Sequence, residues 1–283
     1  MKKLRSFTAR TVVGAAIILT GASVSNAAVR PEADRVVASS LQVMAAESDG
    51  ALEFAKSRST GLIRWLSDAK GAGILVKGGG QPADRSLVFL DAYGAAFGLA
   101  RETVEIRRVS TDDDAGFQHV RLQQVVDDIP VAGGEATIHL RNDKVVSVLA
   151  RTVPDLAEVP RSPSIDAETA AATMRGVLAK HLGIADAELS APRLEIFNRS
   201  LFDGGPFKQS RLAWFAEAAT FDRLEYIWID AVDGSLLLNF NQQPNARNRL
   251  IHDAGNTNAI PGTLVRSECE GVTLDADTEN AYL

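Results

Sequence analysis

The chain has 283 residues, of which 46% are hydrophobic and 23% are charged, a normal composition for a globular protein of one large or two ordinary domains. The formal net charge is −6, and without the basic first 27 residues 26 basic residues would remain against 36 acidic ones. A surface this acidic argues against nucleic acid as a partner. Cys269 is the only cysteine, which excludes an internal disulfide and a structural zinc knuckle.

Residues 1–27 have the pattern of a secretory signal peptide. A basic start is followed by an apolar run over residues 11–20, and Ser25 and Ala27 occupy the minus-three and minus-one positions of a signal-peptidase site. A membrane anchor is the alternative, but this run is shorter than the ~20 residues needed to span a bilayer. We therefore predict a secreted, extracellular protein that leaves the membrane after signal cleavage. Export without disulfides is typical of bacteria.

Residues 28–58 are predicted to form an N-terminal arm. Within them, residues 32–48 have helical spacing of apolar side chains but no strong stop signal, which predicts a loosely held helix or a pro-segment arm. Residues 71–80 form a glycine-rich loop that would let a phosphate approach the backbone amides. No Lys-Ser or Lys-Thr follows a GxxxxG frame there, so a surface loop is favoured.

Residues 59–153 are predicted to form one domain, a helix packed on an antiparallel sheet. The helix begins at Asp84 as its cap and ends at Gly98, and its aromatic stripe of Phe89, Tyr93 and Phe97 indicates core packing. Strands are expected at residues 60–66, 103–109, 119–124, 135–140 and 144–150. Turns are expected at residues 127–130, 133–134 and 142–143.

The central strands alternate between apolar and polar residues, so one side of the sheet can be buried. The residues expected on the buried side are Val120, Leu122, Ala136, Ile138, Leu140, Val146, Val148 and Ala150. The residues expected to point away are Arg121, Gln123, Thr137 and His139.

Three prolines mark residues 154–163 as a linker, and residues 164–241 as a second small unit. Its helix begins near Ser164 or Asp166, carries Ala171, Met174, Leu178 and Leu182 on one stripe, and ends at Gly183. Strands follow at residues 193–198, 212–220, 226–230 and 235–240, the last two joined by an Asp-Gly hairpin. The predicted fold class is α+β, with two small domains that each pack a helix on an antiparallel sheet, and an incomplete β-rich segment at 242–283.

No motif for catalysis or metal binding is present in the sequence. The four histidines, His119, His139, His181 and His252, are each the only one of their segment, and no HExxH, HxxxH or GxSxG occurs. His119 and His139 can be neighbours across the sheet, which would allow a weak metal site, but a structural role in hydrogen bonding is favoured. Cys269 has no context for a nucleophile. We therefore predict no catalytic, cofactor-binding or metal-binding residues.

Clustered carboxylates lie in predicted turns, where acids are common for backbone reasons. They are Asp112–Asp114, Asp127–Asp128, and Asp275 with Asp277. The first group suggests calcium, but it lacks a glutamate at the twelfth position of the loop, so a solvated turn is favoured. Asn198-Arg199-Ser200 fits the glycosylation sequon, and a bacterial signal makes its use improbable.

Two segments carry a family resemblance. FLDAYGAAFGL at residues 89–99, followed by HVRLQQVVDDIPVAGGEATIHL at 119–140, resembles the propeptide of fungalysin and of thermolysin-like secreted zinc metallopeptidases. The family pattern is F-L-x-x-Y-x-x-x-F-G-L, then H-V-R-x-x-Q and I/V-P-V-x-G-G/A. Asp128 stands where the family has glycine, which puts the geometry of that turn in question.

The resemblance continues beyond the linker. LAWFAEAA at 212–219 and IDAVDGSLL at 229–237 resemble the PepSY domain, and residues 248–268 and 275–282 resemble the opening strands of the peptidase domain. It implies a propeptide that helps a cognate thermolysin-like metallopeptidase domain to fold and inhibits it. The zinc-binding HExxH helix is missing, so zinc and calcium are expected only in a peptidase domain, and the chain is expected to be truncated before the catalytic centre. Alternatives are a zinc metalloendopeptidase precursor whose catalytic half is missing from this sequence, or a free-standing secreted protease-binding module.

Overall fold

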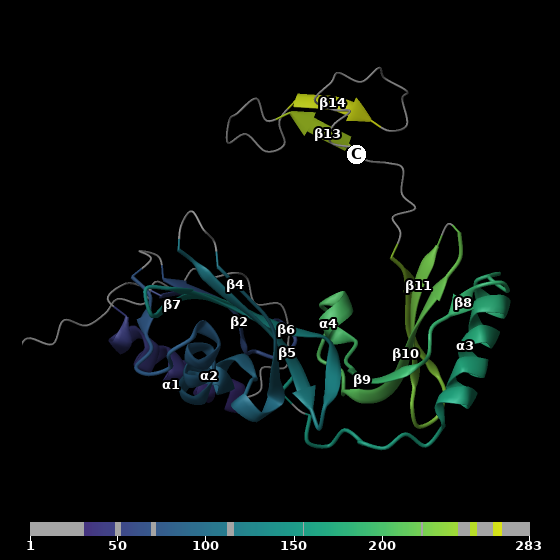
Figure 1. Ribbon diagram of the computed structural model, residues 1–283, viewed down its shortest axis with the longest axis horizontal. Coiled ribbons are helices and arrows are strands. Elements are labelled where there is room, and N and C mark those ends of the chain that lie inside the picture. The colour runs from purple at the N-terminus through teal and green to yellow at the C-terminus, as the bar shows by residue number, and fades with distance from the viewer. Residues whose placement is uncertain are drawn as a thin grey trace, which may run out of the picture.

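A computed structural model describes residues 31–48, 52–68, 72–111, 116–154, 156–221, 223–242, 250–253 and 263–267 (Figure 1). The predicted signal peptide, the acidic turn at Asp112–Asp114, Cys269, and Asp275 with Asp277 lie outside the described residues. No helix in the described ranges is long and apolar enough to cross a membrane.

The described elements are helices separated by runs of strands, the order typical of an α+β fold. The helices are α1 (Pro31–Glu47), α2 (Pro82–Tyr93), α3 (Ala167–His181) and α4 (Ser200–Asp203), with 3₁₀ segments η1 (Gly94–Phe97) and η2 (Arg101–Thr103). The first strands are β1 (Leu52–Lys56), β2 (Ile63–Asp68), β3 (Ile74–Leu75), β4 (Val104–Thr111), β5 (Gln118–Val126), β6 (Ile129–Arg141) and β7 (Lys144–Arg151). The later strands are β8 (Glu188–Leu189), β9 (Arg193–Phe197), β10 (Arg211–Ala219), β11 (Leu224–Asp230), β12 (Leu236–Asn241), β13 (Leu250–Asp253) and β14 (Thr263–Ser267).

Strands β1 to β12 form one continuous sheet, and β13 and β14 form a separate two-stranded one. The main path of the large sheet runs β1-β2-β7-β6-β9-β10-β11-β12. Outside this path, β3 pairs with β7, β5 with β6, β4 with β5, and β8 with β10. The two predicted antiparallel sheets are therefore joined. A single parallel pairing, Val131 with Ile196, connects β6 to β9. The α+β class is confirmed, and the sheets of the two predicted units meet at this one bridge.

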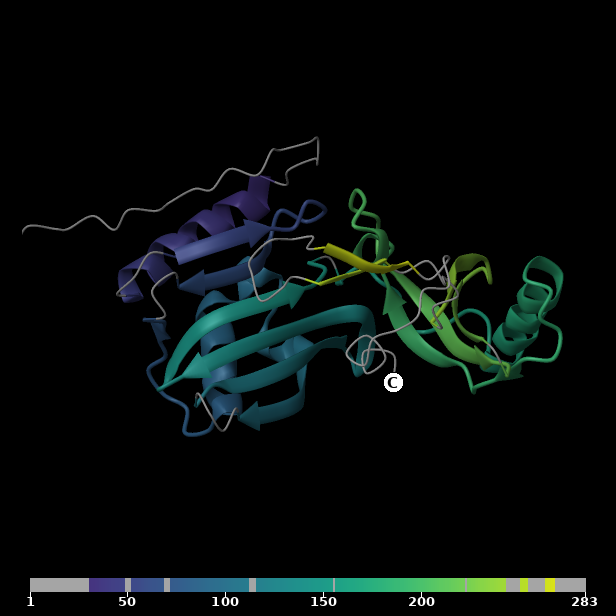
Figure 2. The same ribbon diagram turned by 90° about the horizontal axis from the view of Figure 1, so that it is seen from above.

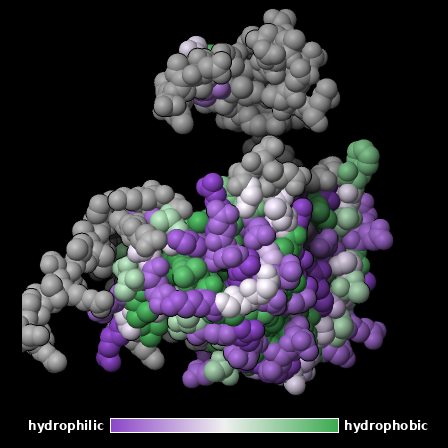
Figure 3. All heavy atoms as spheres, turned by 60° about the vertical axis from the view of Figure 1, so that its left-hand side comes forward, coloured by the Kyte–Doolittle hydropathy of each residue, from purple (hydrophilic) through white to green (hydrophobic). Residues whose placement is uncertain are grey.

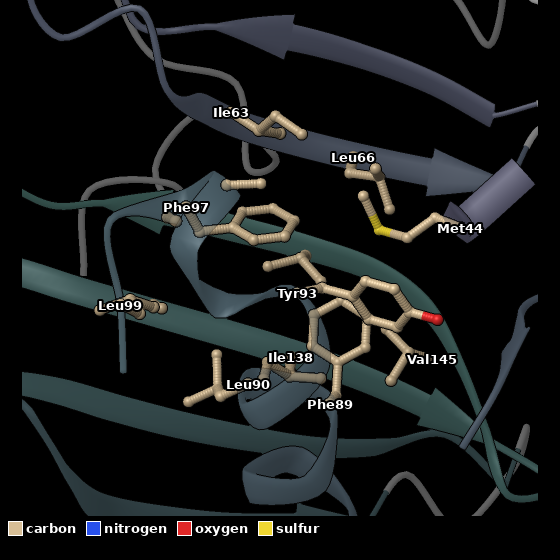
Figure 4. Packing of buried hydrophobic residues seen from close by; sticks show 14 of the residues in the cluster. Met44, Ile63, Leu66, Phe89, Leu90, Tyr93, Phe97, Leu99, Ile138 and Val145 are labelled. Carbon is tan, nitrogen blue, oxygen red and sulfur yellow. The ribbon is translucent and has the colours of Figure 1, made fainter. Parts of the chain in front are cut away.

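The N-terminal hydrophobic core lies between α1, α2 and one side of strands β1 to β7. Figure 4 shows Phe89 and Tyr93 from α2 and Phe97 from η1 turned toward the sheet and toward Met44 of α1. Phe97 and Met44 are both fully buried. Helix α1 and strand β1, which lie within the predicted arm at 28–58, contribute to the same core as the strands of the predicted domain at 59–153.

The aromatic helix differs from its prediction at both ends: it has another N-cap, and α2 ends at Tyr93 and continues to Gly98 only as the 3₁₀ segment η1. Gln81, rather than Asp84, is the N-cap of α2. The Asp84 carboxylate instead accepts a hydrogen bond from the Gln81 backbone N–H, as in a capping box. Gly98 ends the helical segment with φ of 69°, in the left-handed region that favours glycine. A Cβ on Gly98 would lie 2.7 Å from Leu62 Cδ1, so no larger residue fits without a shift.

Two tight turns join the central strands. Asp127 and Asp128 have φ of 49° and 62°, and Asn142 and Asp143 have φ of 48° and 64°. Positive φ at both central residues is the type I′ geometry of two-residue hairpins, which Asn and Asp tolerate. Asp128 therefore adopts the positive φ of this turn without a glycine. The turn predicted at residues 133–134 is wrong, since both glycines lie inside β6.

The registers place the expected residues on the buried side, with one exception. Val145, not Val146, lies opposite Leu140, because the pairing of β6 with β7 shifts between His139 and Leu140. Val145 belongs to the core cluster and Val146 does not.

The first predicted strand begins later than expected. Residues 57–61 form a turn, in which the Gly61 N–H donates to the Ser57 carbonyl at 2.9 Å, so β2 begins at Ile63.

The second unit has its own core between α3 and one side of β9 to β11. The Asp166 carboxylate accepts a hydrogen bond from the Thr169 N–H at 2.7 Å and caps α3. Ala170, Ala171, Met174 and Leu178 are its buried residues. The predicted helix and the four strands are all present, while α4 and β8 were not predicted.

Candidate protein-binding face

One side of the long sheet carries none of the three long helices. Figures 1 and 2 show α1 and α2 against one side of the N-terminal strands and α3 on the outer side of the C-terminal strands. We call the opposite side of β4 to β7 and of β9 to β12 the open face. The single-turn helix α4 packs against it near the junction of the two units, and Figure 1 shows the hairpin of β13 and β14 on the same side of the sheet, farther from the strands. On the face drawn in Figure 3, hydrophilic residues predominate and smaller groups of hydrophobic residues lie between them.

The C-terminal part of the open face is aromatic. Its cluster consists of Phe197, Phe202, Phe215, Tyr226, Trp228 and Phe240. The Phe215 and Trp228 rings are 4.5 Å apart, and Trp228 stacks on Phe240 at 5.7 Å. Phe202, Tyr226 and Phe240 remain half-buried. Phe197, Phe215 and Trp228 are buried beneath them, so the parts of the cluster that a partner can reach are the edges of the three half-buried rings.

A buried carboxylate lies among these rings. Glu195 is only 7% exposed, and its oxygens accept hydrogen bonds from Trp228 Nε1 at 2.8 Å and from Arg193 Nε at 3.1 Å. Arg193 also covers the Phe215 ring at 4.3 Å. Burial raises the pKa of Glu195, and the hydrogen bond from Trp228 and the charge of Arg193 oppose this rise. Glu195 therefore keeps Trp228 in place but is costly to ionise.

Glu195 should make stability depend on pH. Because its folded pKa lies above its ordinary value of 4.5, the stabilising effect of its proton is present at low pH and is lost as pH rises through the folded pKa. We expect the unfolding free energy of the wild type to fall relative to Glu195→Gln between pH 4 and pH 7. Urea unfolding at several pH values measures this difference. Glu188→Gln, at an exposed glutamate, should follow the wild type, and parallel curves for Glu195→Gln would contradict the assignment.

A pocket of about 360 Å³ adjoins the aromatic cluster. It is lined by Phe197, Arg199, Lys208, Gln209, Arg211 and Leu237. Arg199 pairs with Asp203 at 3.0 Å and Arg211 with the buried Asp230 at 2.8 Å. The pocket lining therefore combines basic side chains with apolar ones.

The N-terminal part of the open face is polar. His119 and His139 lie directly opposite each other on β5 and β6, and their Nδ1 atoms are 2.6 Å apart. The sequence analysis favoured a hydrogen-bonding role for them, and this contact has that geometry. Burial and then the nearby His119 lower the pKa of His139, so this ring is neutral at pH 7. Among the described residues, no group of three or more His, Cys, Asp or Glu side chains could hold a metal ion.

Two glutamines of the sequence pattern hold the sheet together. Gln124, the last residue of HVRLQQ, is 1% exposed, and its Nε2 donates to the carbonyls of Gly98 and Val153 at 3.1 and 2.8 Å. Its Oε1 accepts from the Val153 N–H at 3.1 Å. Gln123 Nε2 donates to the Val131 and Gly134 carbonyls at 2.8 and 2.9 Å. The two glutamines of the motif therefore have a structural role, which the sequence analysis missed.

The sequon asparagine is also structural. Asn198 is fully buried, and its Nδ2 donates to the Lys208 carbonyl at 2.7 Å and to Ser210 Oγ at 2.9 Å. Its Oδ1 accepts from the N–H and the hydroxyl of Ser200. A glycan on this nitrogen would require the local structure to open.

Comparison with known proteins bears on the central strands. Residues 102–151, from η2 to β7, match the Fungalysin/Thermolysin Propeptide Motif. No curated protein sequence matches the chain. Among solved structures, the C-terminal domain of Bacillus megaterium YpeB is similar at 12% identity, with 77% of this chain and 100% of that chain covered and a TM-score of 0.33.

The match places a propeptide motif of the fungalysin and thermolysin type in the strands that build the polar part of the open face. It lies within the predicted propeptide domain at 59–153. It ends at residue 151 and does not extend to residues 164–241, for which the PepSY resemblance stays a prediction.

Proposed function

We propose that the chain is the propeptide region of a secreted thermolysin-like metallopeptidase, and that it helps the peptidase domain to fold and blocks its activity until processing. The observation that carries this proposal is the propeptide motif at residues 102–151. Residues of this motif supply the polar part of the open face. The partner is the cognate peptidase domain, outside the cell, and any zinc or calcium belongs to that domain.

The open face supports a role in binding a large partner. A propeptide that guides folding needs a broad, preformed surface, because the partner is not yet folded when contact begins. The face has a half-buried aromatic region, typical of binding anchors, and a polar region with histidines and arginines.

Inhibition in trans tests the proposal. The full chain, added at micromolar concentration to a mature thermolysin-like peptidase that lacks its own propeptide, should abolish casein cleavage. It should also raise the activity recovered when the denatured peptidase is refolded. No inhibition and no gain in refolding would overturn the proposal.

Two arginine variants locate the contact. Phe240→Arg places a charge on the half-buried edge of the aromatic cluster and should weaken inhibition by about tenfold or more. Phe221→Arg is the matched control, because Phe221 is fully exposed in the connection between β10 and β11. This variant should inhibit the peptidase as strongly as the wild type does. Equal inhibition by both variants would place the contact away from the aromatic part of the open face.

A further inference from the structure

A row of four small or imidazole side chains crosses the polar part of the open face. Ser110 lies opposite His119, His119 opposite His139, and His139 opposite Ser147, on strands β4 to β7. All four are half-buried. Because directly paired residues in an antiparallel sheet share one side, the two imidazoles lie side by side with only serines flanking them. The space above the rings is therefore not filled by large neighbours in the same row.

The two rings are arranged so that the same nitrogen of each faces the other. Their planes are at 80° and their centroids 4.8 Å apart, and the Nδ1 atoms are 2.6 Å apart. In the free pair one Nδ1 must carry a proton and donate it to the lone pair of the other. When that ring changes tautomer, so that its proton moves from Nδ1 to Nε2, both Nδ1 atoms present lone pairs and no net proton is lost. Two imidazole lone pairs on adjacent strands are the donor set of a chelate.

The spacing suits a metal ion with little movement. Metal bonds to imidazole nitrogen are about 2.0–2.1 Å long. Two such bonds at a right angle, as in square-planar Cu²⁺ or Ni²⁺ sites, place the nitrogens roughly 2.9 Å apart, and a tetrahedral Zn²⁺ site roughly 3.3 Å. The two Nδ1 atoms are 2.6 Å apart in the structure. They would therefore have to move apart less for a right-angled site than for a tetrahedral one.

We propose that His119 and His139 form a two-histidine site for a borderline divalent transition-metal ion, with Cu²⁺ preferred over Ni²⁺ and Zn²⁺, and with water in the remaining coordination positions. The preference for Cu²⁺ follows from the Irving–Williams order and from the right-angled fit. The ion would link β5 to β6 at their centre. The site does not depend on the proposed inhibition of a peptidase.

The surrounding charges limit the affinity. Arg121, two residues from His119 on β5, is exposed, and Arg141, two residues from His139 on β6, lies over the Phe117 ring at 5.1 Å. Both are cations near the bound ion, and no carboxylate belongs to the row of four. We therefore expect binding in the micromolar range rather than the tighter binding of a site with three or four protein ligands.

Titration of the untagged full chain with Cu²⁺ alone tests the site. We expect one ion per chain at pH 7.5, an electron paramagnetic resonance spectrum with coupling to two imidazoles, and a rise in melting temperature of a few degrees at saturating Cu²⁺. His119→Gln and His139→Gln should each weaken binding roughly tenfold or more, since the second imidazole binds at high effective concentration. His181→Gln is the control, because His181 is exposed at the end of α3.

Coupling to fewer than two imidazoles in the wild-type spectrum would overturn the proposal without recourse to any variant. Retention of wild-type affinity in the folded double variant His119→Gln/His139→Gln would also overturn it. Circular dichroism of each variant establishes that loss of binding is not loss of fold.

Discussion

Replacement of Gln124 by alanine is expected to reduce the unfolding free energy by about 3–5 kcal/mol. The side chain is buried, and its removal leaves the Gly98 carbonyl and both backbone groups of Val153 without their partner. Each buried group left without a hydrogen bond costs about 1–3 kcal/mol, and the vacated volume adds to this. Urea unfolding followed by circular dichroism measures the change.

The neighbouring residue supplies a matched control. Gln123 also donates to backbone carbonyls, those of Gln124, Val131 and Gly134, but it is half-buried, so water can replace its amide when it is removed. Gln123→Ala should therefore cost about 1 kcal/mol. Equal losses for the two variants would show that burial of Gln124 is not what makes it important.

Local signals allowed the main elements of the fold to be predicted. Gly98 ends the aromatic helix because left-handed φ favours glycine, and Asp166 begins α3 because its carboxylate caps the first turn. The alternation of Val120 and Leu122 with polar residues indicated the correct buried side. Each of these features depends on residues close together in the sequence.

Features that depend on distant residues were missed or misplaced. The parallel pairing of Val131 with Ile196 joins strands separated by the linker and α3, and no local pattern encodes it. The shift that replaces Val146 by Val145 in the core arises from an irregularity in pairing with β6. Met44 is buried because α1 packs against α2 and the sheet. The sequence of α1 alone indicates its helical spacing but not the elements that it contacts.

The candidate site was harder to predict than the fold. An open face is defined by where helices do not pack, which requires the whole arrangement. One signal was available: residues 212–216 are apolar without interruption, which is typical of a strand buried on both sides. In β10, Leu212 and Trp214 face α3 while Ala213 and Phe215 face the aromatic cluster. The neighbourhood of His119 and His139 was predicted because their strands are adjacent, and the register confirms it.

Phe97→Ala should cost about 3–5 kcal/mol, since loss of a fully buried phenylalanine removes its transfer free energy and leaves a cavity. Phe97 is fully buried, lies 5.9 Å from the Phe89 ring, and comes from η1, against which both α1 and α2 pack (Figure 4). A loss of this size is a large part of the stability of a typical domain. Chemical unfolding should therefore show a markedly lower midpoint, and the variant should also inhibit a peptidase less as its folded fraction falls.

Phe221→Ala separates this packing effect from the general effect of removing an aromatic ring. Phe221 is fully exposed, so its replacement buries or uncovers almost no surface and should change the unfolding free energy by less than about 0.5 kcal/mol. Phe97→Leu, which keeps most of the apolar volume, should lie between the two because it leaves a smaller cavity. If Phe97→Ala unfolded at the same urea concentration as Phe221→Ala, the helices would not depend on Phe97 for their attachment to the sheet. The N-terminal core would then have to be held by contacts that exclude the aromatic stripe.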